Sequence, residues 1–147
     1  MQFLGDYPAK ADAKGRVFLP AAFRKILDAE GEKSLVLRGD VFQRCLVLYP
    51  ESVWNAQLDG LRQGLNQWNS KQQMMLRQFV LDAEPIELDK EGRLLISKRK
   101  LQYAGIESEV RFLAMLDRIE IWSKQALEEV MNQSATLGND MEAMLGQ

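Results

Sequence analysis

A five-residue phrase that occurs twice constrains the fold of this chain more than any other feature. Asp12-Ala13-Lys14-Gly15-Arg16 returns 77 residues later as Asp89-Lys90-Glu91-Gly92-Arg93, and each copy runs into an apolar stretch typical of a strand. A second matched pair follows in the same order, Leu46-Val47-Leu48-Tyr49 and Ile119-Glu120-Ile121-Trp122. Two matched segments in one order indicate a duplicated structural unit.

Both copies are predicted to contain the same elements: a strand, the repeated turn, a second strand, a short helix and two further strands. In each phrase a glycine precedes the arginine, where a hairpin turn requires a positive φ. Ser97 is predicted to cap the short helix of the second copy, and Gly105 to end it. Helices with leucine and methionine stripes follow, and these stripes are interpreted as packing surfaces, either in the core or between subunits.

The predicted fold class is α+β, because a small unit with few strands cannot bury a core alone. The two copies are therefore expected to pack together about a pseudo-twofold axis. The predicted boundaries are 6–53 for the first repeat, 54–82 for a helical connection, 83–126 for the second repeat, and 127–147 for a C-terminal helix and tail.

The absence of histidine argues against several classes of enzyme. It removes the commonest general base and metal ligand, and the single cysteine, Cys45, lies in an apolar strand pattern typical of a buried residue. No phosphate-binding glycine loop or dinucleotide fingerprint occurs. No catalytic residue, metal, cofactor or small-molecule substrate is predicted, and an enzyme that uses Asp12 and Asp89 is the least supported interpretation.

The start of the chain lacks the basic and apolar regions of a signal peptide, and no stretch approaches the roughly 20 apolar residues of a membrane span. Together with the single cysteine, this predicts a cytoplasmic protein that has no membrane partner.

Basic side chains gather around the repeated phrase, although the net charge is −2. Part of the acidity comes from residues 125–147, which carry four acidic side chains and no basic one. A phosphate backbone responds to the local field, so the overall charge does not exclude DNA.

Two kinds of role are assigned within the turns. Gly15 and Gly92 are expected to shape them, while Asp12 and Asp89 are interpreted either as surface ion-pair partners or as acceptors that fix the backbone.

The basic residues of the turns are the candidate DNA contacts. Arg16 and Arg93 carry the planar fork that matches guanine O6 and N7 or a phosphate, and Lys14 is a candidate phosphate contact. An aspartate that held its arginine in one rotamer would preorganise that arginine for contact with a base of the DNA.

The motifs of the chain resemble those of the MraZ family of bacterial transcriptional regulators over residues 1–131. They are Phe3-x-Gly5, Asp12-x-Lys14-Gly15-Arg16-Val17-x-Leu19-Pro20, Cys45-Leu46-Val47-Leu48-Tyr49-Pro50, Asp89-x-x-Gly92-Arg93-Leu94-Leu95-Ile96, Tyr103-Ala104-Gly105-Ile106 and Ile119-Glu120-Ile121-Trp122. The resemblance implies two tandem AbrB/SpoVT-type swapped-hairpin repeats that form one pseudo-twofold β-barrel with flanking helices.

The same resemblance implies a ring-shaped homo-oligomer in the cytoplasm, associated with the nucleoid. It also implies a repressor of the division and cell wall gene cluster that binds G-rich direct repeats of double-stranded DNA in its own promoter. The DNA-contacting arginine of the family corresponds to Arg16, with Lys14 beside it and Arg93 as the counterpart in the second copy. The alternative is an antitoxin-like oligomeric module that binds another protein.

The chain departs from the family pattern at four places. Ala11 replaces a larger aliphatic residue, Ser97 stands where proline is common, and Met115-Leu116-Asp117 replaces a turn that contains glycine. Lys100-Leu101 stands where an aliphatic residue followed by a basic one is usual, which predicts a shifted helix face.

Overall fold

The computed structural model describes residues 1–133 and 136–146, and within them eight strands and six helices. The strands are β1 (Asp6–Lys10), β2 (Arg16–Phe18), β3 (Leu35–Gly39), β4 (Leu46–Pro50), β5 (Glu84–Ile86), β6 (Arg93–Leu95), β7 (Glu109–Ala114) and β8 (Ile119–Ser123). The helices are α1 (Ala21–Ala29), α2 (Glu51–Gly64), α3 (Ser70–Leu81), α4 (Lys98–Ala104), α5 (Lys124–Asn132) and α6 (Leu137–Leu145).

The strand order confirms that the chain consists of two interleaved copies of one unit. The larger sheet has the order β1-β7-β8-β4-β3-β5, and β2 pairs with β6 in a second sheet. The corresponding strands of the two copies are β1 and β5, β2 and β6, β3 and β7, and β4 and β8. Exchanging each strand for its counterpart gives the order β5-β3-β4-β8-β7-β1, which is the same sheet read from its other edge. The topology therefore has the predicted pseudo-twofold symmetry, within an α+β fold.

The two strands that flank each repeated turn belong to different sheets. β1 pairs with β7 and β5 pairs with β3, so the strand before each turn joins the other copy. The strands after the two turns, β2 and β6, pair with each other. This exchange explains why neither copy could form its sheet alone.

The larger sheet is open, whereas the resemblance implied a barrel. Among the described residues β1 and β5 are its two edges, each paired on one side only. The sheet does not close because the strands that would continue it, β2 and β6, use their hydrogen bonds on each other in a separate two-stranded ribbon.

Local signals at the helix ends are confirmed. The Ser97 hydroxyl accepts a hydrogen bond from the Lys100 amide at 3.3 Å, so serine caps α4 where proline is usual. Gly105 ends α4 with a φ of +67°, and α4 spans the residues predicted for it.

The core lies between the larger sheet, the β2–β6 ribbon and helices α1 and α4. Its largest fully buried side chains are Phe3, Phe23, Phe112, Leu19, Leu37, Leu46, Leu48, Leu94, Ile96, Ile119, Ile121 and Val17. Cys45 is also fully buried, as predicted, and burial raises the pKa of its thiol.

Lys100 occupies a core position in α4. It lies 77 residues after Phe23, the same offset as the repeated phrase, so the two residues correspond, and both side chains are buried. The buried face of α4 is therefore the same as that of α1, and the prediction of a shifted helix face is wrong. The ammonium group is compensated by Glu84 at 3.3 Å and Asp82 at 3.5 Å. A lysine fits here because its long stem packs in the core while its charge reaches two carboxylates.

The other departures have different outcomes. Ala11 is buried in the core, where it packs in place of a larger residue. Leu116 has a φ of +66° and is the one non-glycine residue with positive φ in the described part of the chain. The turn without glycine is therefore strained.

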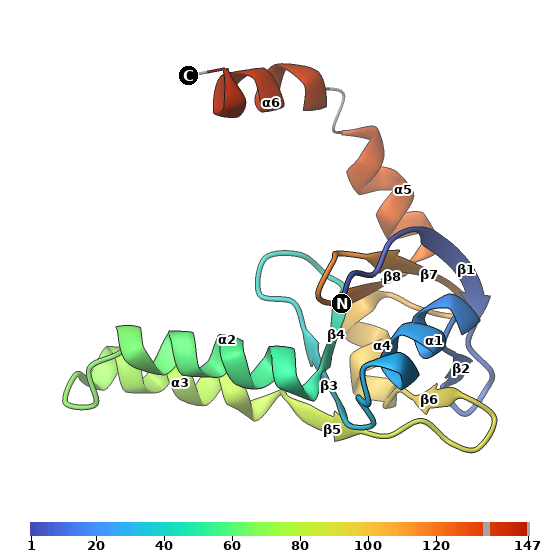
Figure 1. Cartoon of the computed structure of the whole chain (residues 1–147), viewed down its shortest axis with the longest axis horizontal. Helices are drawn as coiled ribbons and strands as arrows, with labels where there is room; N and C mark the ends of the chain where they lie inside the picture. The colour runs from blue at the N-terminus through green and yellow to red at the C-terminus, as the bar shows by residue number, and fades with distance from the viewer. Residues whose placement is uncertain (134–135, 147) are drawn as a thin grey trace.

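Helices α2 and α3 form an arm that leaves the β-sheet on the side opposite β2 and β6 (Figure 1). Trp54 stacks on Phe79 at its base, with ring centroids 5.4 Å apart. α3 has no buried residue, and Met74 and Met75 are each 50% exposed. Core packing is thus confirmed only for Phe79, which packs against the buried cluster around Trp54, whereas packing of the stripe between subunits stays a prediction.

At the C-terminus, α5 leads away from the sheet and α6 stands apart from it (Figure 1). Ser123 caps α5 by accepting a hydrogen bond from the Ala126 amide at 3.0 Å. α6 has no buried residue. Among the described residues, none of the helices has the length and apolar character that a membrane span requires.

Candidate nucleic-acid interface

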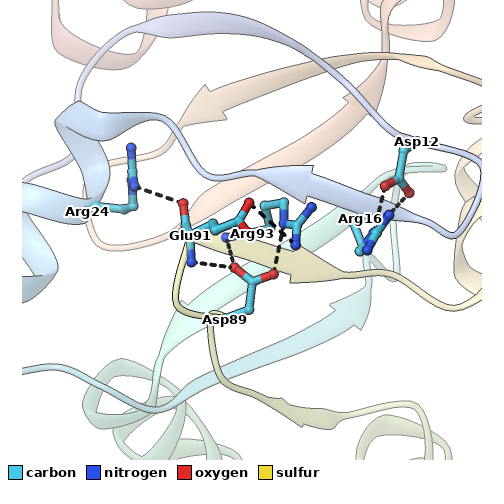
Figure 2. Close-up of polar contacts among 6 residues, drawn as sticks. All are labelled: Asp12, Arg16, Arg24, Asp89, Glu91 and Arg93. Atoms are coloured by element: carbon cyan, nitrogen blue, oxygen red, sulfur yellow. Dashed lines mark hydrogen bonds and ion pairs between the residues drawn. The ribbon is translucent and has the colours of Figure 1, made fainter.

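The first repeated turn is held together by Asp12 (Figure 2). One carboxylate oxygen accepts hydrogen bonds from the backbone amides of Lys14 and Arg16, each at 2.9 Å. The other accepts a hydrogen bond from Arg16 Nε at 2.6 Å. The turn is closed by the Asp12 amide, which donates to the Arg16 carbonyl at 3.0 Å. One aspartate therefore fixes both the backbone of the turn and the direction of its arginine.

The second turn repeats this geometry around Asp89 (Figure 2). Its carboxylate accepts from the amides of Glu91 and Arg93 at 3.0 and 2.9 Å and from Arg93 Nε at 2.8 Å. The two roles considered for the aspartates, ion pair and backbone acceptor, occur together in both turns.

Each glycine lets its turn approach the other copy closely. Gly15 and Gly92 have φ values of +87° and +84°, which confirms the predicted conformation. The Gly15 carbonyl accepts from the Ile96 amide at 2.8 Å, and the Gly92 carbonyl accepts from the Leu19 amide at 3.0 Å. These bonds extend the β2–β6 ladder into both turns, so the turns lie at opposite ends of one ribbon.

The hydrogen bonds within each turn stabilise the ionised form of its aspartate. The Arg16 amide is the largest cause that lowers the pKa of Asp12, and burial opposes it. The Arg93 amide does the same for the pKa of Asp89. The hydrogen bond to Asp89 raises the pKa of the Arg93 guanidinium, against the effect of burial. Both aspartates are therefore charged at neutral pH.

The two arginines differ in what surrounds them. Arg16 bonds to Asp12 through Nε alone, and in residues 1–133 and 136–146 its two terminal nitrogens have no protein partner. A terminal nitrogen of Arg93 lies 3.6 Å from the Glu91 carboxylate. The side chain of Arg16 is 37% exposed and that of Arg93 is 21% exposed. Arg16 is thus the freer of the two.

Sequence reasoning missed Glu91 and Arg24 as parts of the second turn. Arg24 comes from α1 and donates a 3.4 Å hydrogen bond to the Glu91 carbonyl (Figure 2). A side chain at position 92 would meet the guanidinium of Arg24. In the first turn the corresponding neighbour of Gly15 is Leu101, which lies 77 residues after Arg24. Glu91 was visible in the sequence, because aligning the two phrases places it opposite Lys14. Arg24 has no local signal.

The predicted site residues come together in two clusters on one ribbon. Lys14 is exposed at the tip of the first turn, and the described part of the chain offers its ammonium no partner. No group of three histidine, cysteine, aspartate or glutamate side chains that could hold a metal ion occurs among the described residues. The arrangement presents arginine forks and an ammonium group to solvent, which suits an anionic partner.

Comparison with known proteins relates the chain to one family. The family model described as "MraZ protein, putative antitoxin-like" matches it twice, over residues 2–78 and 79–146, so each match contains one turn. The chain is 52% identical over 145 residues to the transcriptional regulator MraZ of Bacteroides fragilis, covering 99% of this chain and 92% of that protein.

Two further relatives carry the same name. The protein from Phocaeicola vulgatus is 53% identical over 146 residues, covering 99% of this chain and 95% of the relative. The protein from Lachnoclostridium phytofermentans is 36% identical over 126 residues, covering 86% and 84%.

Proposed function

The chain belongs to the MraZ family, and from that premise we propose that it is a transcriptional regulator that binds double-stranded DNA through its two repeated turns. One observation carries the proposal. In each turn an aspartate holds the arginine by Nε, at 2.6 Å for Arg16 and 2.8 Å for Arg93. An arginine held in this way binds DNA with less loss of side-chain freedom.

The proposed contacts follow from the chemistry of the three basic side chains. Arg16 presents two terminal nitrogens, the pair that donates to O6 and N7 of a guanine in the major groove. Lys14 contacts a phosphate, which supplies affinity without reading sequence. Arg93 makes the second, weaker contact, because Glu91 competes for one of its terminal nitrogens. Asp12, Gly15, Asp89 and Gly92 hold the turns in shape.

We further propose that several chains assemble into a ring in the cytoplasm, associated with the nucleoid, and repress the division and cell wall gene cluster. A ring would present identical turns at repeated intervals to G-rich direct repeats in the promoter of the cluster. Avidity then compensates for the small contact area of one turn and for the net charge of −2. The half-exposed Met74 and Met75 on α3 supply apolar surface for assembly.

The proposed division of the chain follows the two copies. Repeat one comprises residues 6–53 and repeat two residues 83–126, with the arm at 54–82 and the C-terminal segment at 127–147. The two matches to the family model support two units, each with its own turn.

The test is a gel shift of the full chain on the duplex just upstream of its own reading frame, with Arg16→Ala. We expect the variant to lose about 10- to 100-fold in affinity, the range of one bidentate guanine contact. The matched control is Arg62→Ala, because Arg62 is a 67% exposed arginine in the arm, away from both turns. Affinity of the unchanged protein should also fall steeply with salt.

Two outcomes would contradict the proposal. Equal losses in the two variants would remove Arg16 from the interface. Failure of the unchanged protein to bind the duplex at low salt would favour the alternative, an antitoxin-like module that binds another protein.

A further inference from the structure

The β2–β6 ribbon has one face toward the core and one toward solvent. Its pairs are Arg16 with Leu95, Val17 with Leu94, and Phe18 with Arg93. Paired residues in an antiparallel ladder share a face, and neighbours along a strand alternate. Val17 and Leu94 are buried on the inner face.

The outer face therefore combines two arginines with two large apolar side chains. Phe18 is 52% exposed and Leu95 is 58% exposed. Each lies two residues after the arginine of its own strand and directly opposite the arginine of the other strand. The guanidinium carbon of Arg93 is 5.7 Å from the centre of the Phe18 ring. We name Arg16, Phe18, Arg93 and Leu95 the ribbon face.

The arginines decide which partner suits this face. Asp12 and Asp89 bond to the two arginines through Nε. A second apolar protein surface would therefore bury the terminal nitrogens of Arg16, which the described residues leave without an acceptor, and that burial is costly. A two-stranded ribbon fits the major groove of B-DNA, about 12 Å wide, where guanine accepts hydrogen bonds and thymine presents its C5-methyl group. Duplex DNA offers both kinds of contact in one groove.

We infer that the ribbon face lies in the major groove, and that Phe18 and Leu95 read thymine methyl groups beside the guanines that Arg16 and Arg93 contact. This inference rests on the proposed function and deepens it. The arginines select guanine and the apolar side chains select thymine at neighbouring positions. Phe18 and Leu95 are thus specificity-determining residues of the same interface.

The experiment replaces thymine by deoxyuridine, which lacks only the C5-methyl group, throughout the duplex upstream of the reading frame. Dissociation constants of the unchanged full chain are measured on both duplexes. We expect the deoxyuridine duplex to bind about fourfold more weakly for each methyl group contacted, the factor for burial of one group of that size.

Variants then assign the effect to the ribbon face. Phe18→Ala and Leu95→Ala should each bind the thymine duplex more weakly and lose part of the preference for thymine, and the double variant should lose it entirely. Phe42→Ala is the control, since Phe42 is 88% exposed in the loop between β3 and β4. It should keep the full preference.

Three outcomes would overturn the inference. Equal binding of the two duplexes by the unchanged protein, with Arg16→Ala still impaired, would leave the proposed function intact and remove the methyl contacts. A preference that survives in the Phe18 and Leu95 double variant would assign it elsewhere. A lower assembly mass of Phe18→Ala in solution would make the ribbon face a subunit contact. If the unchanged protein bound neither duplex, that result would instead refute the proposed function.

Discussion

The amide of Ile96 donates a 2.8 Å hydrogen bond to the carbonyl of Gly15, so the second copy of the unit bonds directly to the repeated turn of the first. The reciprocal bond runs from Leu19 to Gly92 at 3.0 Å. The two turns are therefore parts of one ribbon, and a change in one copy acts directly on the turn of the other.

This relationship predicts unequal costs for alanine at the two glycines. Both have positive φ, which costs roughly 1–2 kcal/mol for a side chain with Cβ. A Cβ on Gly15 would also meet the Ile96 carbonyl, which is fixed backbone, whereas one on Gly92 would meet the flexible end of Arg24. Gly15→Ala should lower the unfolding free energy more than Gly92→Ala in urea titrations. An equal or reversed order would contradict this account.

Glu91 is predicted to weaken DNA binding by the second turn. It stands where the first turn has Lys14, and its carboxylate lies 3.6 Å from an Arg93 terminal nitrogen. Glu91→Lys removes that competitor and adds a phosphate contact. We expect tighter binding to the promoter duplex and a plot of log affinity against log salt that is steeper by about one.

Two variants serve as controls for Glu91→Lys. Glu91→Gln should raise affinity without the added salt dependence, because it removes a negative charge and adds no positive one. Glu107→Lys makes the same charge change at an exposed residue beyond α4. If it tightened binding as much as Glu91→Lys, the effect would be one of overall charge.

The sequence predicted the parts of the fold that depend on local chemistry. Ser97 and Gly105 delimit α4 as expected, and both turn glycines have positive φ, because capping and turn formation involve residues a few positions apart. The exchange of β1 and β5 between the copies confirmed what the family resemblance implied. The open sheet was not anticipated, because it depends on the pairing of β2 with β6 rather than with its neighbours.

The same reason limited the prediction of the site. The aspartate–arginine pairs lie within five residues and were foreseen as one option. Arg24 reaches the second turn from α1 by tertiary packing, which no local pattern records. Lys100 was misread because a charged residue in a helix usually faces solvent, whereas here Glu84 and Asp82 compensate its charge at a core position.

Lys100 leads to a prediction about stability. Its ammonium group is 3.3 Å from Glu84, so Glu84→Ala leaves a buried charge with Asp82 alone and should cost about 1 kcal/mol. In a Lys100→Met background the same change should cost almost nothing, because no buried charge remains. Lys100→Met itself should be neutral or stabilising, since methionine fills the position of the stem. Chemical denaturation of the four proteins measures the cycle, and additive costs would mean that the pair is not coupled.

The aspartates of the turns predict how stability depends on pH. Backbone amides of Arg16 and Arg93 hold the pKa values of Asp12 and Asp89 below the ordinary value. A carboxyl with a lowered pKa in the folded state contributes stability that is fully present above its unfolded pKa of about 4 and is lost as the pH falls through its folded pKa. The melting temperature should therefore drop between pH 5 and pH 2 partly because of these two residues.

The double variant Asp12→Asn, Asp89→Asn tests this prediction. It should have a lower melting temperature at pH 7, but its melting temperature should fall less on acidification, as measured by thermal melts at pH 7, pH 5 and pH 2. Asp59→Asn is the control, because Asp59 is 67% exposed in the arm and pairs with Arg62 at 3.8 Å on the surface. If the double variant and the control lost melting temperature in parallel with the unchanged protein, the turns would not be the source of the acid sensitivity.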